Sequence, residues 1–186
     1  MTAEEFVDAV KAGDIARVRM ALAEDPTLAA IRLANGETPL MAALYRGHHL
    51  IVSAIVDAGA PIDVFAAAAL GRFTELASAL QDPAQVNAVS YDGWTPLHLA
   101  AFFGQKIAGE RLLDAGANIH AVSRNSIGNT PLHAATAGRR ADVALMLIGR
   151  GAPTDVADSG GYTPLRIAEE NKLVEVVAAI RRTVEP

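Results

Sequence analysis

Apolar residues recur along this chain in short blocks at the spacing of one helix face, and glycine or proline stands between the blocks. In residues 51–56 the apolar positions are Ile51, Val52, Ile55 and Val56, and residues 143–147 carry a similar set. Recurrence at this spacing indicates amphipathic helices. Because the blocks are short and closely punctuated, the pattern predicts many short helices joined by turns.

The punctuation itself repeats. The tripeptide Thr-Pro-Leu begins at Thr38, Thr95, Thr130 and Thr163, at intervals of 57, 35 and 33 residues. A glycine-centred marker follows three of these copies, as "DAGAPIDV" from residue 57, "DAGANIHA" from residue 114 and "GRGAPTDV" from residue 149. Two markers at a near-fixed distance predict a repeated unit of turn, short helix, short helix and turn, with a period near 33 residues.

Each marker residue has a mechanical role. Threonine accepts a hydrogen bond from a free N–H of the first helical turn, and proline is tolerated directly after it because its missing N–H is not needed there. His98 and His133 stand three residues after a threonine, where an acceptor nitrogen can reach back to the threonine's own N–H. We therefore expect capping from both histidines. Gly47 and Gly104 are expected to end first helices, since glycine tolerates positive φ.

The pattern resembles the ankyrin repeat. The residues that carry the resemblance are "NGETPLMAALYRGHH", "DGWTPLHLAAFFGQ", "GNTPLHAATAGRR" and "GGYTPLRIAEENK", together with the three glycine-centred markers. The resemblance implies an all-α ankyrin-repeat solenoid of about six helix-turn-helix units joined by β-hairpin-like tips, in a single domain over residues 1–186. The expected units are approximately 2–34, 35–64, 65–90, 91–123, 124–157 and 158–182.

Three departures from the pattern carry structural expectations. The 57-residue interval is too short for two units, and residues 63–67 enter a helix without the usual turn, so a truncated third repeat is expected to lack most of its tip and its first helical turn. The 35-residue interval places two extra residues in the tip at 123–129. In the last unit, Asn171 or Lys172 replaces the helix-ending glycine, and asparagine tolerates the left-handed conformation better.

The resemblance also implies a function and a face. Ankyrin repeats present their tips and first helices to protein partners, and four of the chain's nine aromatic residues fall on such positions in the fourth repeat. Adjacent exposed rings are typical of binding hot spots. The alternative is that Trp94 packs along the neighbouring hairpin and that one phenylalanine fills the space between repeats. The predicted partner-binding residues are Tyr91, Asp92, Trp94, Phe102, Phe103, Tyr45, Arg46, Leu70, Arg124, Ile127, Asn129 and Tyr162.

Composition and charge narrow the function class. The formal net charge is −5 and no run of Lys and Arg exceeds two residues, which argues against nucleic acid or an anionic membrane as partner. There is no cysteine, and the N-terminal residues lack the basic and apolar regions of a secretory signal, so a soluble cytoplasmic protein is expected.

Catalytic, metal-binding and cofactor-binding motifs were sought in the sequence, and none is predicted. His48 and His49 are adjacent, so on a helix they point about 100° apart and cannot easily share one metal. We expect a non-enzymatic, monomeric protein-interaction module. The alternatives are an enzyme or metal-dependent protein built on the repeats, a purely structural scaffold, and an array that self-associates weakly through the aromatic patch.

Overall fold

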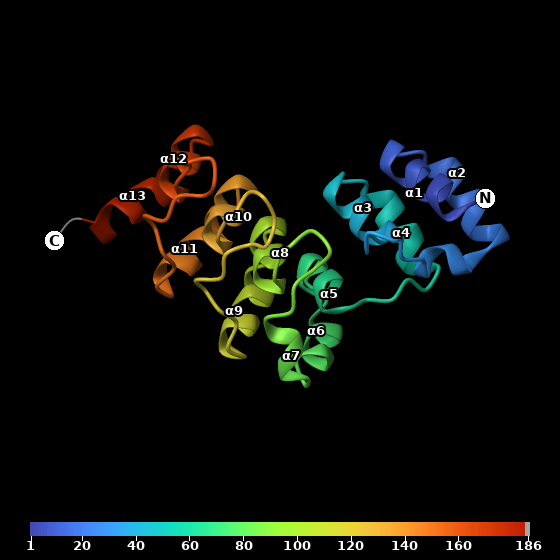
Figure 1. The fold of residues 1–186 in the computed structure, drawn as a ribbon, viewed down its shortest axis with the longest axis horizontal. Coiled ribbons are helices and arrows are strands. Elements are labelled where there is room, and N and C mark those ends of the chain that lie inside the picture. Colours follow the sequence, from blue (N-terminus) through green and yellow to red (C-terminus); the bar gives the residue numbers. More distant parts are fainter. Residues whose placement is uncertain (185–186) are drawn as a thin grey trace. The chain divides into compact units, whose positions relative to one another are not determined.

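The computed structural model describes residues 1–184 and is all-helical, with no strand among those residues (Figure 1). This confirms the predicted all-α class. In chain order the elements are α1 (Ala3–Ala12), α2 (Ile15–Glu24), the 3₁₀ helix η1 (Pro26–Ala30), α3 (Pro39–Tyr45), α4 (His49–Asp57), α5 (Val64–Leu70), α6 (Phe73–Ala79), α7 (Pro83–Val86), α8 (Pro96–Phe103), α9 (Lys106–Asp114), α10 (Pro131–Ala137), α11 (Ala141–Gly149), α12 (Pro164–Glu170) and α13 (Val174–Val184).

The chain divides into two compact units, Met1–Ile62 and the remainder from Asp63 onward. In the first unit, α1 pairs with α2 and α3 with α4, around fully buried Phe6, Leu40, Ile51 and Ile55. Burying such aliphatic and aromatic side chains is the main driving force for folding, at roughly 25 cal/mol per Å² of apolar surface. That residues 1–186 act as a single domain stays a prediction.

In the second unit, helix pairs α5–α6, α8–α9, α10–α11 and α12–α13 stack on one another (Figure 1). The first helices α5, α8, α10 and α12 contact in that order, as do the second helices α9, α11 and α13. Leu97, Leu112, Leu132 and Leu147 are fully buried between them. Each pair therefore buries its apolar face against its neighbours, as in a linear repeat array. The count of six repeats stays a prediction.

The third repeat, which contains α5 and α6, differs from the prediction in one respect. Six residues separate α4 from α5, against fourteen between α11 and α12, so the hairpin tip is indeed absent. However, α5 has seven residues, as many as α3, α10 and α12, so the expected loss of a helical turn is wrong. Asp63 explains this outcome, because its carboxylate accepts a hydrogen bond from Ala66 N at 2.9 Å and starts the helix without a threonine. The short helix α7 was not predicted.

Each remaining tip is closed by one backbone hydrogen bond at its base. Ser90 N donates to Trp94 O at 2.8 Å and Asp158 N to Tyr162 O at 2.9 Å, whereas Ser123 N reaches two residues further, to Asn129 O at 2.8 Å. The two extra residues predicted in the 123–129 tip are therefore confirmed.

The tips of the second unit also bond to one another. Arg124 N donates to Gly93 O and Ser159 N to Ile127 O, both at 2.8 Å. A side chain at Gly93 would lie 2.7 Å from the backbone nitrogen of Asn125, and its φ is +86°. Glycine is required here for both reasons, and the tips form a continuous edge along α8, α10 and α12.

Candidate protein-binding surface

His98 and His133 join each first helix to the next tip. The Nδ1 of His98 lies 2.8 Å from Thr95 Oγ1 and 3.4 Å from Thr95 N, and its Nε2 lies 3.0 Å from Asn129 O. His133 makes the same contacts with Thr130 and with Tyr162 O. A neutral ring that accepts at Nδ1 and donates from Nε2 satisfies all of these contacts. The predicted capping role is confirmed for both residues.

Burial keeps these rings neutral. Desolvation lowers the pKa of His98 to about 4, because the charged ring would lose its water, although the bond to Asn129 O acts in the opposite direction. Burial lowers the pKa of His133 in the same way, opposed by its bond to Tyr162 O. Both histidines are thus engaged in holding the tips.

Three rings lie in sequence along α8 and its tip, but they are not equally exposed. Trp94 retains only 9% exposure, so the expectation that its ring stands open is wrong. It packs against Phe102 at 5.3 Å between ring centres and against His98 at 5.9 Å. Phe102 in turn packs edge-on against Phe103 at 5.2 Å, and both phenylalanines are half-buried. Buried Trp94 therefore supports the ring of Phe102.

The other predicted residues fall into three groups. Asn129 is 7% exposed, so its expected exposure at the tip is also wrong; its backbone closes the hairpin and accepts from His98. Tyr91, Asp92, Leu70 and Tyr45 are half-buried, and Arg46, Arg124, Ile127 and Tyr162 are exposed. Tyr45 and Arg46 belong to the first unit and the remainder to the second.

Tyr162 carries a charged group over its ring. The guanidinium carbon of Arg166 lies 4.1 Å from the ring centre, and Arg166 Nε bonds Glu170 at 3.1 Å. A cation at this distance over an aromatic face is attracted by about 0.5–1 kcal/mol at an exposed site. The sequence offered a signal for this pair, since Arg166 replaces the capping histidine and is free to turn outward.

A second surface, which the sequence reasoning missed, lies where each first helix meets its second helix. Here a polar side chain from one repeat bonds a carbonyl near the end of the preceding first helix: Gln105 bonds Ala69 O at 3.2 Å, Arg140 bonds Phe102 O at 3.1 Å, and Asn171 bonds Thr136 O at 3.1 Å. Such bonds satisfy carbonyls that a helix leaves unpaired at its end.

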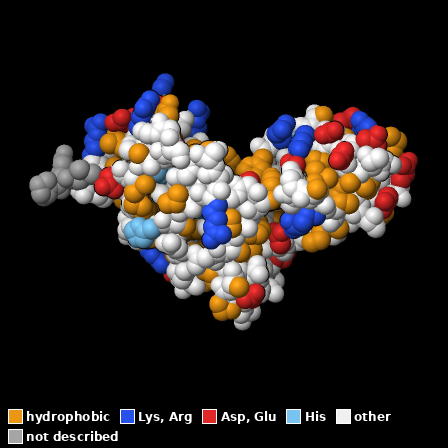
Figure 2. All heavy atoms as spheres, in the orientation of Figure 1, with side chains coloured by type: hydrophobic (Ala, Val, Ile, Leu, Met, Phe, Trp, Pro, Cys, Tyr) orange, Lys and Arg blue, Asp and Glu red, His pale blue; other side chains and the backbone are white. Residues whose placement is uncertain are grey.

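This junction surface carries several cations. Lys and Arg side chains gather over the α10–α12 part of the second unit in Figure 2. Arg139 and Lys172 have φ of 57° and 59°, the position that Gly71 and Gly104 occupy in the preceding repeats. Of the two candidates for the last unit, Lys172 adopts the left-handed conformation and Asn171 ends the helix just before it, so the preference for asparagine was wrong.

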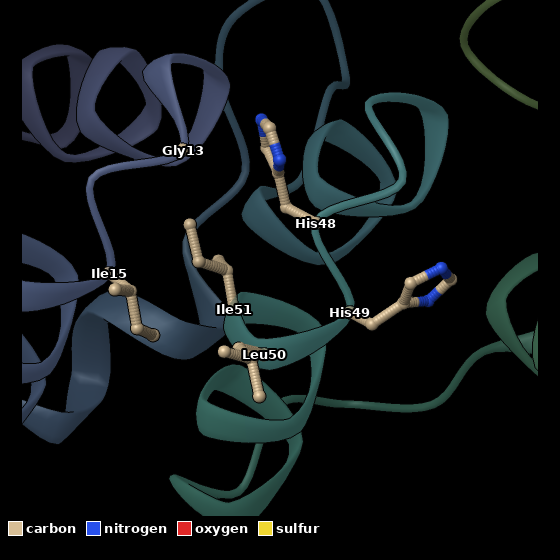
Figure 3. A pocket seen from close by; sticks show the side chains of 6 residues that line it. All are labelled: Gly13, Ile15, His48, His49, Leu50 and Ile51. Carbon is tan, nitrogen blue, oxygen red and sulfur yellow. The ribbon is translucent and has the colours of Figure 1, made fainter.

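The first unit has a separate pocket of about 270 Å³ between the starts of α2 and α4 (Figure 3). Ile15, Leu50 and Ile51 line it, His48 points toward Gly13, and His49 points away (Figure 3). The Nε2 of His48 lies 3.3 Å from Lys11 O, which places this ring in the same helix-end role as Gln105. Within residues 1–184 no three His, Asp or Glu side chains are grouped so that they could hold a metal ion.

No helix in the described part of the chain is long and apolar enough to cross a bilayer.

Stacked helix pairs with hydrogen-bonded tips define a helical repeat protein. Comparison with known protein families gives its family. A model of ankyrin repeats (3 copies) matches residues 6–123 and 64–158. The chain therefore belongs to the ankyrin repeat family.

Three relatives are similar over about half of the chain. The human neurogenic locus notch homolog protein 4 is 45% identical over 92 residues, which are 47% of this chain and 4% of that protein. Mouse Rabankyrin-5 is 36% identical over 90 residues, 46% of this chain and 8% of that protein. The Drosophila melanogaster neurogenic locus Notch protein is 37% identical over 106 residues, 54% of this chain and 4% of that protein. The chain thus spans a small part of the length of these relatives.

Proposed function

We propose that the chain is a non-catalytic protein-interaction module whose second unit binds a protein partner through the tips and first helices, centred on α8. Ankyrin repeats are generally protein–protein interaction modules, and repeat arrays use extended surfaces of this kind for binding. We place Phe102 and Phe103 at the centre of the surface, with Tyr91, Asp92, Arg124, Ile127 and Tyr162 around them.

One observation carries this proposal. Phe102 and Phe103 stand next to each other at the end of α8, both half-buried, and buried Trp94 packs against the first ring. Two adjacent large rings left partly in water cost free energy that a binding partner recovers when it covers them. Rings held rigid before binding also lose little entropy when the partner arrives.

The first unit contributes to the proposal separately. Tyr45 is half-buried at the end of α3 and Arg46 is exposed beside it. Arg46 Nη1 bonds Lys11 O at 3.5 Å, a long contact at an exposed position. We propose these two residues as a smaller contact area of the first unit, whose loss weakens binding less than the loss of Phe103.

Phe103→Ala is the sharpest test, because Phe103 lies at the outer end of the ring series. The chain is immobilised, a protein is captured from lysate of the native host, and the purified partner is titrated by calorimetry. We expect Phe103→Ala to weaken that affinity about 30-fold or more, the effect of a hot-spot residue worth about 2 kcal/mol. Phe73→Ala is the matched control, since Phe73 is 41% exposed on α6 of the same unit.

The thermal midpoint separates binding from folding. Phe103→Ala should leave it nearly unchanged, whereas Trp94→Ala should lower it, because Trp94 is buried. Equal affinities for Phe103→Ala and the unmodified chain would show that the surface lies elsewhere. Light scattering over a concentration series tests the remaining alternative: a mass that rises with concentration, and stays low in Phe103→Ala, would mean that the rings serve self-association.

A further inference from the structure

We propose that the junction surface beside α8 binds an acidic segment of the partner, through a cationic strip formed by Lys106, Arg139, Arg140 and Lys172. This inference rests on the proposed function and adds the partner's chemistry to it. The segment carries Asp or Glu side chains opposite the strip and one large apolar side chain that reaches Phe103.

The four cations form one connected row. Arg140 Nε bonds Phe102 O at 3.1 Å, and a side chain on Gly104 would meet Arg140 Cδ at 2.8 Å, so Arg140 lies against the turn that leads to Lys106. Arg139 Nε bonds Asn171 Oδ1 at 2.9 Å, which places it next to Lys172. All four side chains are exposed. Figure 2 shows Lys and Arg side chains over the α12 region, together with Asp and Glu side chains.

The row is not neutralised by the chain itself. Among residues 1–184, no carboxylate oxygen lies within 4.0 Å of a side-chain nitrogen of these four residues. Glu169 pairs with Arg181 at 2.8 Å and Glu170 with Arg166 at 3.1 Å, while Glu110, Asp142 and Glu175 on α9, α11 and α13 form no ion pair with the strip in the described chain. The row thus holds four exposed cations without a direct ion pair in a protein whose formal net charge is −5, which favours an acidic partner.

Backbone strain gives a second, independent reason. Arg139 and Lys172 are the non-glycine residues with positive φ in the described chain, and both belong to the strip. The left-handed conformation costs a residue with a side chain of order 1 kcal/mol, and glycine at the equivalent positions Gly71 and Gly104 avoids that cost. A helix end gains from a cation in its last turn, but that gain does not require the strained position.

The strip runs into the ring surface at Arg140. Because this side chain bonds the backbone of Phe102, it lies at the end of α8, the helix end that carries the half-buried Phe102 and Phe103. One extended segment therefore contacts both features, with carboxylates along the strip and an apolar side chain at the rings. Electrostatic attraction then brings the segment in and fixes its register.

The experiment uses the full chain and a defined probe, a fluorescein-labelled peptide of Asp and Glu with one central Leu. Its affinity is measured by anisotropy in about 50 mM and about 300 mM NaCl, because salt screens exposed charges. The test variant is Arg139→Gly with Lys172→Gly, which removes two cations and relieves two strained positions. The control is Arg150→Gln with Arg19→Gln, which removes two exposed cations elsewhere.

We expect the test variant to bind the peptide about tenfold more weakly than the control, with a thermal midpoint no lower than that of the unmodified chain. Raising the salt should weaken binding by the unmodified chain more than binding by the test variant, which keeps only Lys106 and Arg140 of the strip. A peptide with Asn and Gln in place of the acids should bind weakly to all three proteins.

Equal peptide affinities in the test variant and the control overturn the inference. So does equal binding of the neutral peptide, or tighter binding of single-stranded DNA or of anionic vesicles than of the acidic peptide. The captured partner distinguishes the two proposals. If Phe103→Ala loses that partner while Arg139→Gly with Lys172→Gly retains it at full affinity, the interaction surface stands and the acidic segment is wrong. If neither variant loses it, both proposals fail.

Discussion

In the second unit, the start and the end of the first helices carry opposite kinds of polar residue. The start, beside the tip, is called here the tip end, and the other is the junction end. At the tip end, Thr95, His98 and Asn129 are buried, neutral and hydrogen-bonded to one another. At the junction end, Arg139, Arg140 and Lys172 are exposed and charged, and two of them are in a strained conformation. Polar residues at the tip end thus hold the fold together, although the buried Oδ1 of Asn129 has no hydrogen-bond partner among the described residues. The residues at the junction end include choices that stability alone does not explain.

The difference indicates where binding can vary without loss of the fold. Removing a buried hydrogen-bonded group leaves its partners unsatisfied, at about 1–3 kcal/mol each. Removing an exposed cation usually changes stability by less than about 0.5 kcal/mol. Substitutions at the two ends should therefore separate sharply, with large stability effects at the tip end and binding effects at the junction end.

The largest effect is expected from His98→Ala. The change removes a fully buried ring, leaves Thr95 N without its partner, leaves Asn129 O with only its bond from Ser123 N, and opens a cavity beside Trp94. We expect the free energy of unfolding to fall by about 3 kcal/mol, measured by urea denaturation of the full chain. His120→Ala, at an exposed position of the same unit, should change it by less than about 0.5 kcal/mol. Similar losses in the two variants would mean that the tips are held by other contacts.

Lowering the pH should reduce the free energy of unfolding through the same tip-end residues, by somewhat less than His98→Ala does. The folded pKa of His98 is about 4, below its ordinary value of 6.5, so the unfolded chain binds more protons between these values. The stability that His98 provides is therefore present above about pH 6.5 and is lost as the pH falls toward 4. His133 acts in the same direction. We expect a loss of about 2–3 kcal/mol across this window, measured by urea denaturation at several pH values.

His98→Gln is the control for the pH experiment, because glutamine is polar but does not titrate. Its stability should fall less steeply between pH 6.5 and 4 than that of the unmodified chain. An unchanged slope would assign the pH dependence to His133 or to the carboxylates instead.

The tip end was readable from the sequence because its determinants are local. A threonine, a proline and a histidine within four residues specify a capped helix start whatever surrounds them, and the two extra residues of the 123–129 tip follow from counting. The burial of Trp94 could not be predicted, because it depends on Phe102, which lies eight residues later and packs against the Trp94 ring.

The junction end was not readable for the same physical reason. Its contacts join residues about one repeat apart, such as Arg140 with Phe102 and Asn171 with Thr136. Side-chain preference favoured Asn171 for the left-handed position, but the helix ends at Asn171 and places the turn on Lys172. Tertiary geometry overrode the local preference, and the cationic strip becomes visible only when the repeats are stacked.

The smallest effect, and the one that sharpens the comparison most, is a gain in stability from Lys172→Gly. Lys172 has φ of 59°, and its nitrogen has no ion-pair partner within the described residues, so glycine removes strain and little else. Glycine also loosens the unfolded chain, which opposes the gain. We expect a net increase of about 0.5–1 kcal/mol in the free energy of unfolding.

Lys172→Ala is the matched control, since it removes the charge and keeps the strain, and its stability should stay close to that of the unmodified chain. If alanine stabilises as much as glycine, the benefit comes from removing the charge, and Lys172 no longer supports the argument that strain is kept for binding.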